Sequence, residues 1–147
     1  MKTLKIAIAS DHAGFKLKKD IIKYLHELGA TVKDFGSYNE DPVDYPDYGH
    51  PLAKAIERGE YSKGISICGS GNGINMTVNK HQGIRSAICW NDEIARLARS
   101  HNDANICALP ARFISKEEAI SIVDVFLSTD FEGGRHILRI NKISIND

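Results

Sequence analysis

The sequence predicts an α/β protein with a doubly wound parallel sheet, and two observations lead to this fold class. Short apolar runs, each about the length of a buried strand, recur along the 147-residue chain. Segments with apolar residues at helical spacing lie between these runs, so that strands and helices alternate. Such alternation joins parallel strands by right-handed crossovers, and in these sheets ligands bind beyond the carboxyl ends of the strands.

The first half of the chain supplies three of the five expected strands. A stripe of apolar residues at helical spacing supports the first helix, which Gly29 closes. A segment rich in Asp, Pro and Tyr reads as a surface loop, and Gly59 stops the short helix that follows it. In order, we expect a strand at Leu4–Ser10, a helix over Phe15–Leu28, a strand at Thr31–Phe35, a loop at Asn39–Pro51, a helix at Leu52–Arg58 and a strand at Gly64–Ile67.

The second half supplies the remaining two strands and the helices around them. Ser115 is a good N-cap for a helix with five apolar residues on one stripe. In order, we expect a helix ending near Lys80, a strand at Ile84–Cys89, a helix at Asp92–Ser100, a strand at Ala104–Leu109, the helix after Ser115, and a final helix or arm over Arg135–Ile143. No internal repeat or linker interrupts the pattern, so residues 1–147 are expected to form one domain.

Composition excludes several classes of protein. Lys and Arg number 19, as do Asp and Glu, so no global field favours a nucleic acid or an acidic surface. The amino terminus is too short and polar for a signal peptide, and no apolar run approaches the length of a membrane span. Three cysteines without a CxxC pair argue against a disulfide framework and against a zinc site, so the cytoplasm is the expected compartment.

The stretch with the most chemistry is the loop Cys68-Gly69-Ser70-Gly71-Asn72-Gly73, which follows the third strand. Its backbone N–H groups and the helix that follows favour an anion, and a thiolate at its first position would be stabilised there. A tight strand-to-helix turn is the plainer reading. A degenerate dinucleotide site also stays open, because Asp92 lies near the end of the next strand. Cys89 and Cys107 lie within apolar strands and are expected to be buried.

Three further groups of residues could belong to the same site. Asp11 and His12 follow the first strand, although this pair could also cap a helix. His101 and Asn102 could simply end a helix. His101 precedes the fifth strand and so lies at the opposite end of the sheet. If it belongs to the same site, a second subunit supplies it most simply, which predicts a homodimer with shared active sites. Arg135 and Arg139 are four residues apart on one helical face, which suits a dianion as well as it suits a solvated basic end.

Taken together, these motifs resemble a known family. In order along the chain, the motifs are Ser10-Asp11-His12-Ala13-Gly14, Asp44-Tyr45-Pro46, Cys68-Gly69-Ser70-Gly71, Asn79-Lys80, Gly83-Ile84-Arg85, Ala98 to Asn105 and Gly133-Gly134-Arg135-His136. This ordered set is similar to type B ribose-5-phosphate isomerase, in the ribose/galactose-6-phosphate isomerase family. The resemblance covers essentially the whole chain. It implies a Rossmann-like three-layer sandwich with a C-terminal helical arm. It also implies a cofactor-free and metal-free aldose–ketose isomerase, whose homodimer shares its active sites and could pair into a dimer of dimers.

The resemblance also implies roles for individual residues. Cys68 would be the base for the carbon proton, and Ser70 would assist proton movement among the substrate oxygens. The amides of Gly71, Asn72, Gly73 and Ile74 would stabilise an enediolate oxygen. His101 with Asp11 would open the sugar ring, and Asn102 would orient hydroxyls. His12, Arg112, Arg135 and Arg139 would bind the phosphate, and His136 receives no role.

Two departures from the family pattern bear on these roles. Part of the family uses a glutamate at the position of Ile74, and isoleucine cannot act as a base, so Cys68 is the only candidate in this loop. Pro110 stands where glycine is usual; it lacks an N–H and restricts φ, which leaves the placement of Arg112 open.

Two other functions compete with isomerisation of ribose 5-phosphate. One is isomerisation of a hexose 6-phosphate, such as allose or galactose 6-phosphate, which the depth of the pocket would decide. The other is a non-catalytic binder of a nucleotide or phosphometabolite, which would need neither Cys68 nor His101. Either enzyme would take a small phosphosugar, with no nucleic acid and no membrane as partner.

Overall fold

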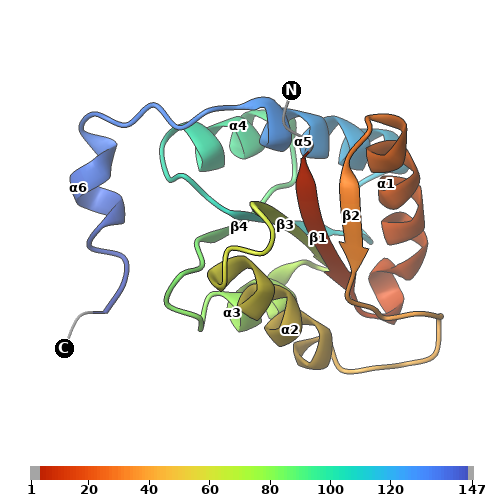
Figure 1. Ribbon diagram of the computed structural model, residues 1–147. Helices are drawn as coiled ribbons and strands as arrows, with labels where there is room; N and C mark the ends of the chain where they lie inside the picture. The colour runs from red at the N-terminus through yellow and green to blue at the C-terminus, as the bar shows by residue number, and fades with distance from the viewer. Residues whose placement is uncertain (1–3, 146–147) are drawn as a thin grey trace.

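The computed structural model describes residues 4–145 (Figure 1). In this part of the chain five parallel strands form a sheet in the order β2-β1-β3-β5-β4. The five-stranded parallel sheet predicted from the sequence is therefore confirmed. The strands are β1 (Lys5–Ser10), β2 (Thr31–Asp34), β3 (Lys63–Cys68), β4 (Ser86–Ile88) and β5 (Ile106–Pro110).

Helices cover both faces of the sheet, as a three-layer sandwich requires. Crossovers through α1 and α4 run in one direction along the sheet and use one face, whereas those through α2 and α3 run in the other direction and use the opposite face. Right-handed connections produce this arrangement. The helices are η1 (His12–Gly14, a 3₁₀ turn), α1 (Phe15–Glu27), α2 (Pro46–Glu57), α3 (Asn72–Val78), α4 (Asp92–Ser100), α5 (Lys116–Ser128) and α6 (His136–Ile140).

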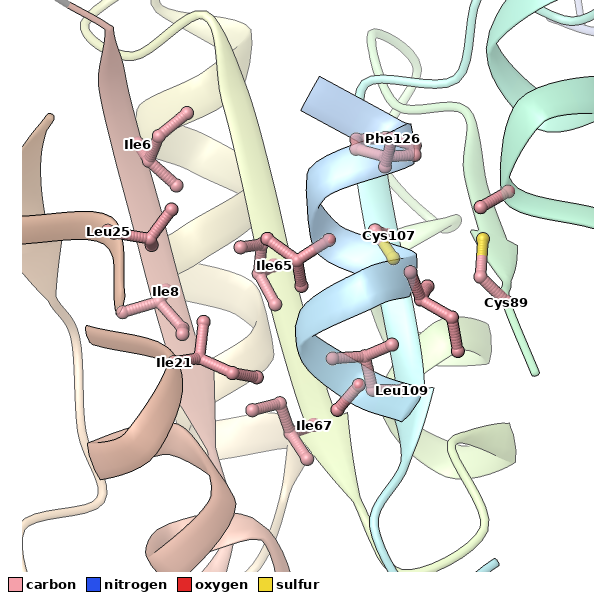
Figure 2. Packing of buried hydrophobic residues seen from close by; sticks show 14 of the residues in the cluster. Ile6, Ile8, Ile21, Leu25, Ile65, Ile67, Cys89, Cys107, Leu109 and Phe126 are labelled. Atoms are coloured by element: carbon pink, nitrogen blue, oxygen red, sulfur yellow. The ribbon is translucent and has the colours of Figure 1, made fainter. Parts of the chain in front are cut away.

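The central strands are apolar on both faces because both are covered. Large side chains such as Ile8, Ile65 and Leu109 pack against α1 and α5, as Figure 2 shows. On the opposite face, the small side chains of Ala7 and Ala9 pack beneath α2. None of the helices in residues 4–145 has the length and apolar character that crossing a membrane requires.

A buried lysine ties α1 to the segment that follows β2. Lys18 is fully buried, and its ammonium donates to Asp34 Oδ1 at 2.7 Å and to the carbonyl of Ser37. Burial lowers the pKa of Lys18, and the hydrogen bond and charge of Asp34 oppose this effect. The contacts fix the start of the long connection that carries Val43, Asp44 and Tyr45 back toward the sheet.

The expected loop at Asn39–Pro51 is wrong in its second half, because α2 begins at Pro46 rather than at Leu52. Pro46 occupies the first turn, where no intrahelical partner for its missing N–H is needed. Pro51 lies inside the helix and removes one hydrogen bond. Burial of Gly49, Leu52 and Ala53 against the sheet and α3 compensates for that loss.

The other differences between the prediction and the structure are at the ends of strands and helices. The fourth strand is limited to Ser86–Ile88, and Cys89 lies directly after it, although its N–H still donates to Ala108 O at 2.9 Å. Cys89 and Cys107 are both completely buried, as expected. The final helix, α6, is shorter than predicted and lies in an arm on the β4 side of the sheet (Figure 1).

Close packing at Gly14 leads to a prediction. A Cβ on this glycine would lie 2.6 Å from Cγ2 of Ile67 and 2.9 Å from its carbonyl oxygen. We expect Gly14→Ala to lower the free energy of unfolding by about 2–3 kcal/mol, measured by urea denaturation, because backbone and core must move apart. Gly29→Ala is the control: it has open space and a φ of 83°, so only about 1 kcal/mol of backbone strain is expected there. An effect at Gly14 no larger than at Gly29 would contradict the packing argument.

Candidate active site

The register of the three central strands brings their carboxyl ends to one edge of the sheet. Ser10 pairs with Ile67, and Cys68 pairs with Pro110. The residues that follow are joined by backbone hydrogen bonds, from Asp11 N to Ile67 O and from Ala111 N to Cys68 O. A cleft of about 670 Å³ opens at this edge and is lined by Asp11, His12, Ala13, Val43, Asp44, Tyr45, Cys68, Gly69, Ser70, Gly73, Arg112 and Phe113.

Cys68 ends β3 and lies at the wall of this cleft with 5% of its surface exposed. The loop after it turns sharply into α3 through Gly71, which has a φ of 79°. A Cβ on Gly71 would also lie 3.3 Å from the backbone of Leu109 and of Pro110. Both the left-handed backbone and the close approach of β5 therefore require glycine here.

The loop presents backbone donors next to the thiol. α3 begins at Asn72, and the first N–H groups of a helix have no acceptor within it. The amide of Asn72 donates to Ser70 Oγ at 3.2 Å, so the hydroxyl of Ser70 already engages one of these donors. Residues Gly71 to Ile74, which the resemblance implicates as oxyanion donors, thus lie together in the first turn of α3 and the residue before it.

Asp11 and His12 reach the cleft from the end of β1. Asp11 Oδ1 accepts hydrogen bonds from Ala13 N at 3.0 Å and Gly14 N at 3.2 Å, so it does cap η1 while it lines the cleft. Val43 N donates to Nδ1 of His12 at 3.1 Å. In the neutral ring this acceptor role assigns the proton to Nε2, which leaves His12 with an N–H to offer a ligand.

Arg112 lies beside the cysteine loop despite the proline that precedes it. Its backbone N–H donates to Gly69 O at 3.0 Å. Its guanidinium lies over Gly69, where a Cβ would be 3.1 Å from Nη1. Pro110 needs no donor because it is the last residue of β5, and the next two residues carry the hydrogen bonds to the loop.

The other predicted residues do not line this cleft. His101 is the C-cap of α4, and with Asn102 it lies at the amino end of β5, as expected. The five residues of β5 separate the two ends by about 16 Å. Arg135 and Arg139 are exposed on the arm around α6. Within one chain, the structure therefore gathers Asp11, His12, Cys68, Ser70 and Arg112, and leaves His101, Asn102, Arg135 and Arg139 apart from them.

His101 instead packs against the arm. Its ring stacks on that of His136, with centroids 4.3 Å apart and planes 17° apart. Nε2 of His136 lies 3.6 Å from Oε2 of Glu132. Burial of the ring, with smaller effects from the charges of His101 and Arg135, lowers the pKa of His136, and the carboxylate of Glu132 opposes this effect.

Glu132, His101 and His136 have donor atoms within 4.8 Å of one another and are the one group of metal-ligand type found in residues 4–145. Ligands of a single ion direct converging lone pairs at it. The lone pairs of an imidazole lie in its plane, and the two rings here are nearly parallel, so the observed arrangement suits stacking better than chelation.

Asp92 is the residue on which the alternative prediction of a dinucleotide site depended. Its carboxylate accepts a hydrogen bond from Ser121 on α5.

Sequence reasoning assigned no role to Val43, Asp44, Tyr45 and Phe113, which complete the cleft. The ring of Tyr45 lies on Gly73 so closely that a Cβ there would be 2.4 Å from Cζ. The composition of this segment indicated an exposed loop. The available signal was the motif Asp44-Tyr45-Pro46, whose proline marks the start of α2 and so places the tyrosine at its N-cap.

The fold and the cleft together define a doubly wound α/β protein. Its cleft, at the carboxyl edge of the sheet, is lined by a cysteine, a serine hydroxyl, a histidine, an arginine and the glycines of the loop after β3. Comparisons with known proteins narrow this class. A family model described as Ribose/Galactose Isomerase matches residues 6–143. Ribose-5-phosphate isomerase B of Escherichia coli is 43% identical over 140 residues, which cover 95% of this chain and 94% of the relative. A probable ribose-5-phosphate isomerase B of Mycoplasma pneumoniae is 48% identical over 139 residues, covering 94% and 91%.

Comparison with solved structures leads to the same family. A ribose 5-phosphate isomerase of Thermotoga maritima has a TM-score of 0.95 and 51% identity, covering 97% of this chain and 99% of that one. Ribose-5-phosphate isomerase B of Mycoplasma genitalium, solved with bound ribulose-5-phosphate, has a TM-score of 0.91 and 42% identity, covering 97% and 95%. This chain belongs to the ribose/galactose isomerase family, and the resemblance read from its motifs is confirmed.

The environments of the three cysteines differ enough to predict their reactivity. Cys68 borders the cleft, whereas a hydrogen bond with Cys89, together with burial, raises the pKa of the Cys107 thiol. We expect iodoacetamide to alkylate Cys68 alone in the folded protein and all three thiols after unfolding, as read by peptide mass spectrometry. Cys68→Ser should leave the folded protein unmodified. Alkylation of Cys89 or Cys107 ahead of Cys68 would contradict these assignments.

Proposed function

We propose that this chain is a ribose-5-phosphate isomerase, which interconverts D-ribose 5-phosphate and D-ribulose 5-phosphate through an enediolate. The observation that carries the proposal is that a thiol, a hydroxyl, first-turn amides, a histidine and an arginine surround one cleft at the edge of the sheet. The relative solved with ribulose-5-phosphate supports the same substrate class.

Proton transfer is the task of the cysteine loop. The Cys68 thiolate removes the proton from C2 of the open-chain aldose and returns it to C1, and the reverse reaction runs the same steps backward. Amides of Gly71 to Ile74 stabilise the negative oxygen of the enediolate. Ser70 moves protons between the substrate oxygens; its hydroxyl accepts a hydrogen bond from the Asn72 amide and still has its own O–H and a second lone pair for the substrate.

Ring opening and phosphate binding use residues from two subunits. Asp11 from one subunit and His101 from a second open the furanose, and Asn102 of that second subunit orients the sugar hydroxyls. His12 and Arg112, which line the cleft, bind the phosphate together with Arg135 and Arg139 from the second subunit's arm. Guanidinium groups suit this dianion because they donate paired hydrogen bonds.

The proposal therefore includes a homodimer with shared active sites, which could pair further into a dimer of dimers. Exposed apolar side chains on the arm, among them Leu138 with 72% of its surface exposed, support a partner at this surface. Three free thiols suit a reducing compartment, so the cytoplasm and the non-oxidative pentose phosphate pathway are the proposed setting.

The direct test is an isomerase assay in the presence of a chelator and without added nucleotide. Ribose 5-phosphate, allose 6-phosphate and galactose 6-phosphate are supplied separately, and ketose formation is followed. Turnover of the pentose is expected. Activity confined to a hexose 6-phosphate would retain the chemistry and change the substrate, and no activity on any of the three would favour a non-catalytic binder.

Cys68→Ala is expected to lower kcat by about 10²- to 10⁴-fold, because the general base is lost. KM should change little, since the thiolate acts on the carbon proton only during the reaction. Steady-state kinetics with ribose 5-phosphate measure both values, and Cys89→Ala serves as the control for loss of a buried thiol. A Cys68→Ala enzyme with wild-type turnover would remove Cys68 as the base.

Arg139→Ala is expected to raise KM by about 10- to 100-fold, because a charge-assisted contact to phosphate is lost. Lys142→Ala on the same arm removes an exposed cation outside the proposed phosphate site and should leave KM within about twofold of wild type. Equal effects of the two substitutions would indicate a general electrostatic contribution and would contradict a specific role for Arg139.

A further inference from the structure

The turn that carries His101 and Asn102 has an unusual backbone. The N–H of His101 donates to Leu97 O at 2.9 Å and ends α4, and the N–H of Asp103 donates to Arg99 O at 3.1 Å. Asp103 has a φ of 46°, and it is the one non-glycine residue with a positive φ among those described. A side chain in this left-handed region is disfavoured, so other contacts must hold the turn in place.

Arg85 provides the first set of contacts. It comes just before β4, and its guanidinium reaches the backbone of the turn. Nε donates to Asn102 O at 2.9 Å, and Nη2 donates to Asp103 O at 2.9 Å and to Asp103 Oδ2 at 3.2 Å. One planar group therefore fixes two successive carbonyls and the carboxylate.

Arg99 provides the second set. Its Nη1 donates to Asp103 Oδ1 at 2.8 Å and to Ala104 O at 2.7 Å, and its side chain is 9% exposed. Its Nε donates to Thr129 O at 3.1 Å, at the end of α5. The two carboxylate oxygens of Asp103 are thus divided between two guanidinium groups.

The residues held by these contacts directly follow His101, the proposed ring-opening residue. His101 is the residue directly before the turn's Asn102 and Asp103, and its ring stacks on that of His136. The arm that bears His136 is itself tied to α4, because Glu132 N donates to Ser100 O at 3.0 Å. Displacing the turn would therefore move both His101 and Asn102 relative to His136 and the arm.

We propose that Arg85 and Asp103 are positioning residues, which hold His101 and Asn102 in the geometry needed to open the sugar ring. The inference rests on the proposed function. Neither residue lines the cysteine cleft, so their loss should affect ring opening while leaving the proton transfer at Cys68 intact.

The chemistry of the two substrates allows these steps to be measured separately. Ribose 5-phosphate is a furanose and must open before its C2 proton can be removed. Ribulose 5-phosphate has its carbonyl at C2 and its 5-hydroxyl esterified, so it has no furanose form. In D₂O the base removes a C1 proton from ribulose 5-phosphate, the thiol exchanges with solvent, and a deuteron returns to C1. This exchange requires no ring opening.

The experiment compares Arg85→Lys and Asp103→Asn with wild type in both reactions. For each variant, kcat for conversion of ribose 5-phosphate should fall by about 10- to 100-fold, since a displacement near 1 Å is costly in catalysis. Deuterium exchange into ribulose 5-phosphate, followed by NMR, should stay within about threefold of wild type. Arg58→Lys, which alters a surface contact with Glu60, is the matched control and should change neither reaction.

Each outcome either supports or overturns the positioning role of Arg85 and Asp103. An equal loss of both reactions would assign Arg85 and Asp103 a structural role only, and would overturn the proposal, as would unchanged conversion of ribose 5-phosphate. Wild type that catalyses neither reaction would overturn the proposed function itself. His101→Asn supplies the reference, because it should show the same division between lost conversion and retained exchange.

Discussion

The parallel pairing of β1, β3 and β5 is the constraint on which the rest of the structure depends. Its register aligns Ser10 with Ile67 and Cys68 with Pro110, so three loops leave the sheet at the same edge. β1 and β5 continue to helices on one face, and β3 continues to α3 on the other. The loops consequently diverge around β3, and the opening between them is the cleft that Cys68 borders.

The same register places the two groups of predicted site residues at opposite edges of the sheet. Groups suited to proton transfer and anion binding gather at the carboxyl edge, whereas His101 and Asn102 lie at the amino edge beside the arm. One sheet cannot bring these edges together, because the length of β5 lies between them. A catalyst that uses both must combine two chains, and a two-fold symmetric dimer would then contain two equivalent sites.

Much of this architecture could be predicted from the sequence, because hydrophobic periodicity and glycine placement are local signals. The strands around Ile8, Ile65 and Leu109 read directly as buried runs, and Gly71 marked the turn that requires a left-handed backbone. The start of α2 could not be predicted in this way. Its first turn is rich in Asp, Tyr and Pro, and it is helical because tertiary burial of Gly49 and Leu52 outweighs local preference.

The site was predictable where residues follow strands and unpredictable where contacts are long-range. Asp11, Cys68 and Arg112 meet because parallel strands end together, which the strand order implies. The contact of Val43 N with His12 and the packing of Tyr45 on Gly73 join segments about 30 residues apart, and no local pattern indicates them. The same holds for Arg85 and Asp103, which are 18 residues apart in the sequence.

The most direct test of the account is complementation between two inactive variants. Cys68→Ala and His101→Asn are each expected to be nearly inactive alone. Mixed, partly unfolded and refolded together, they would form heterodimers with one intact site, and about a quarter of wild-type activity should return per chain. Recovery of activity would establish that one chain's cysteine works with another chain's histidine. No recovery, with heterodimers shown to be present by native mass spectrometry, would contradict the shared site.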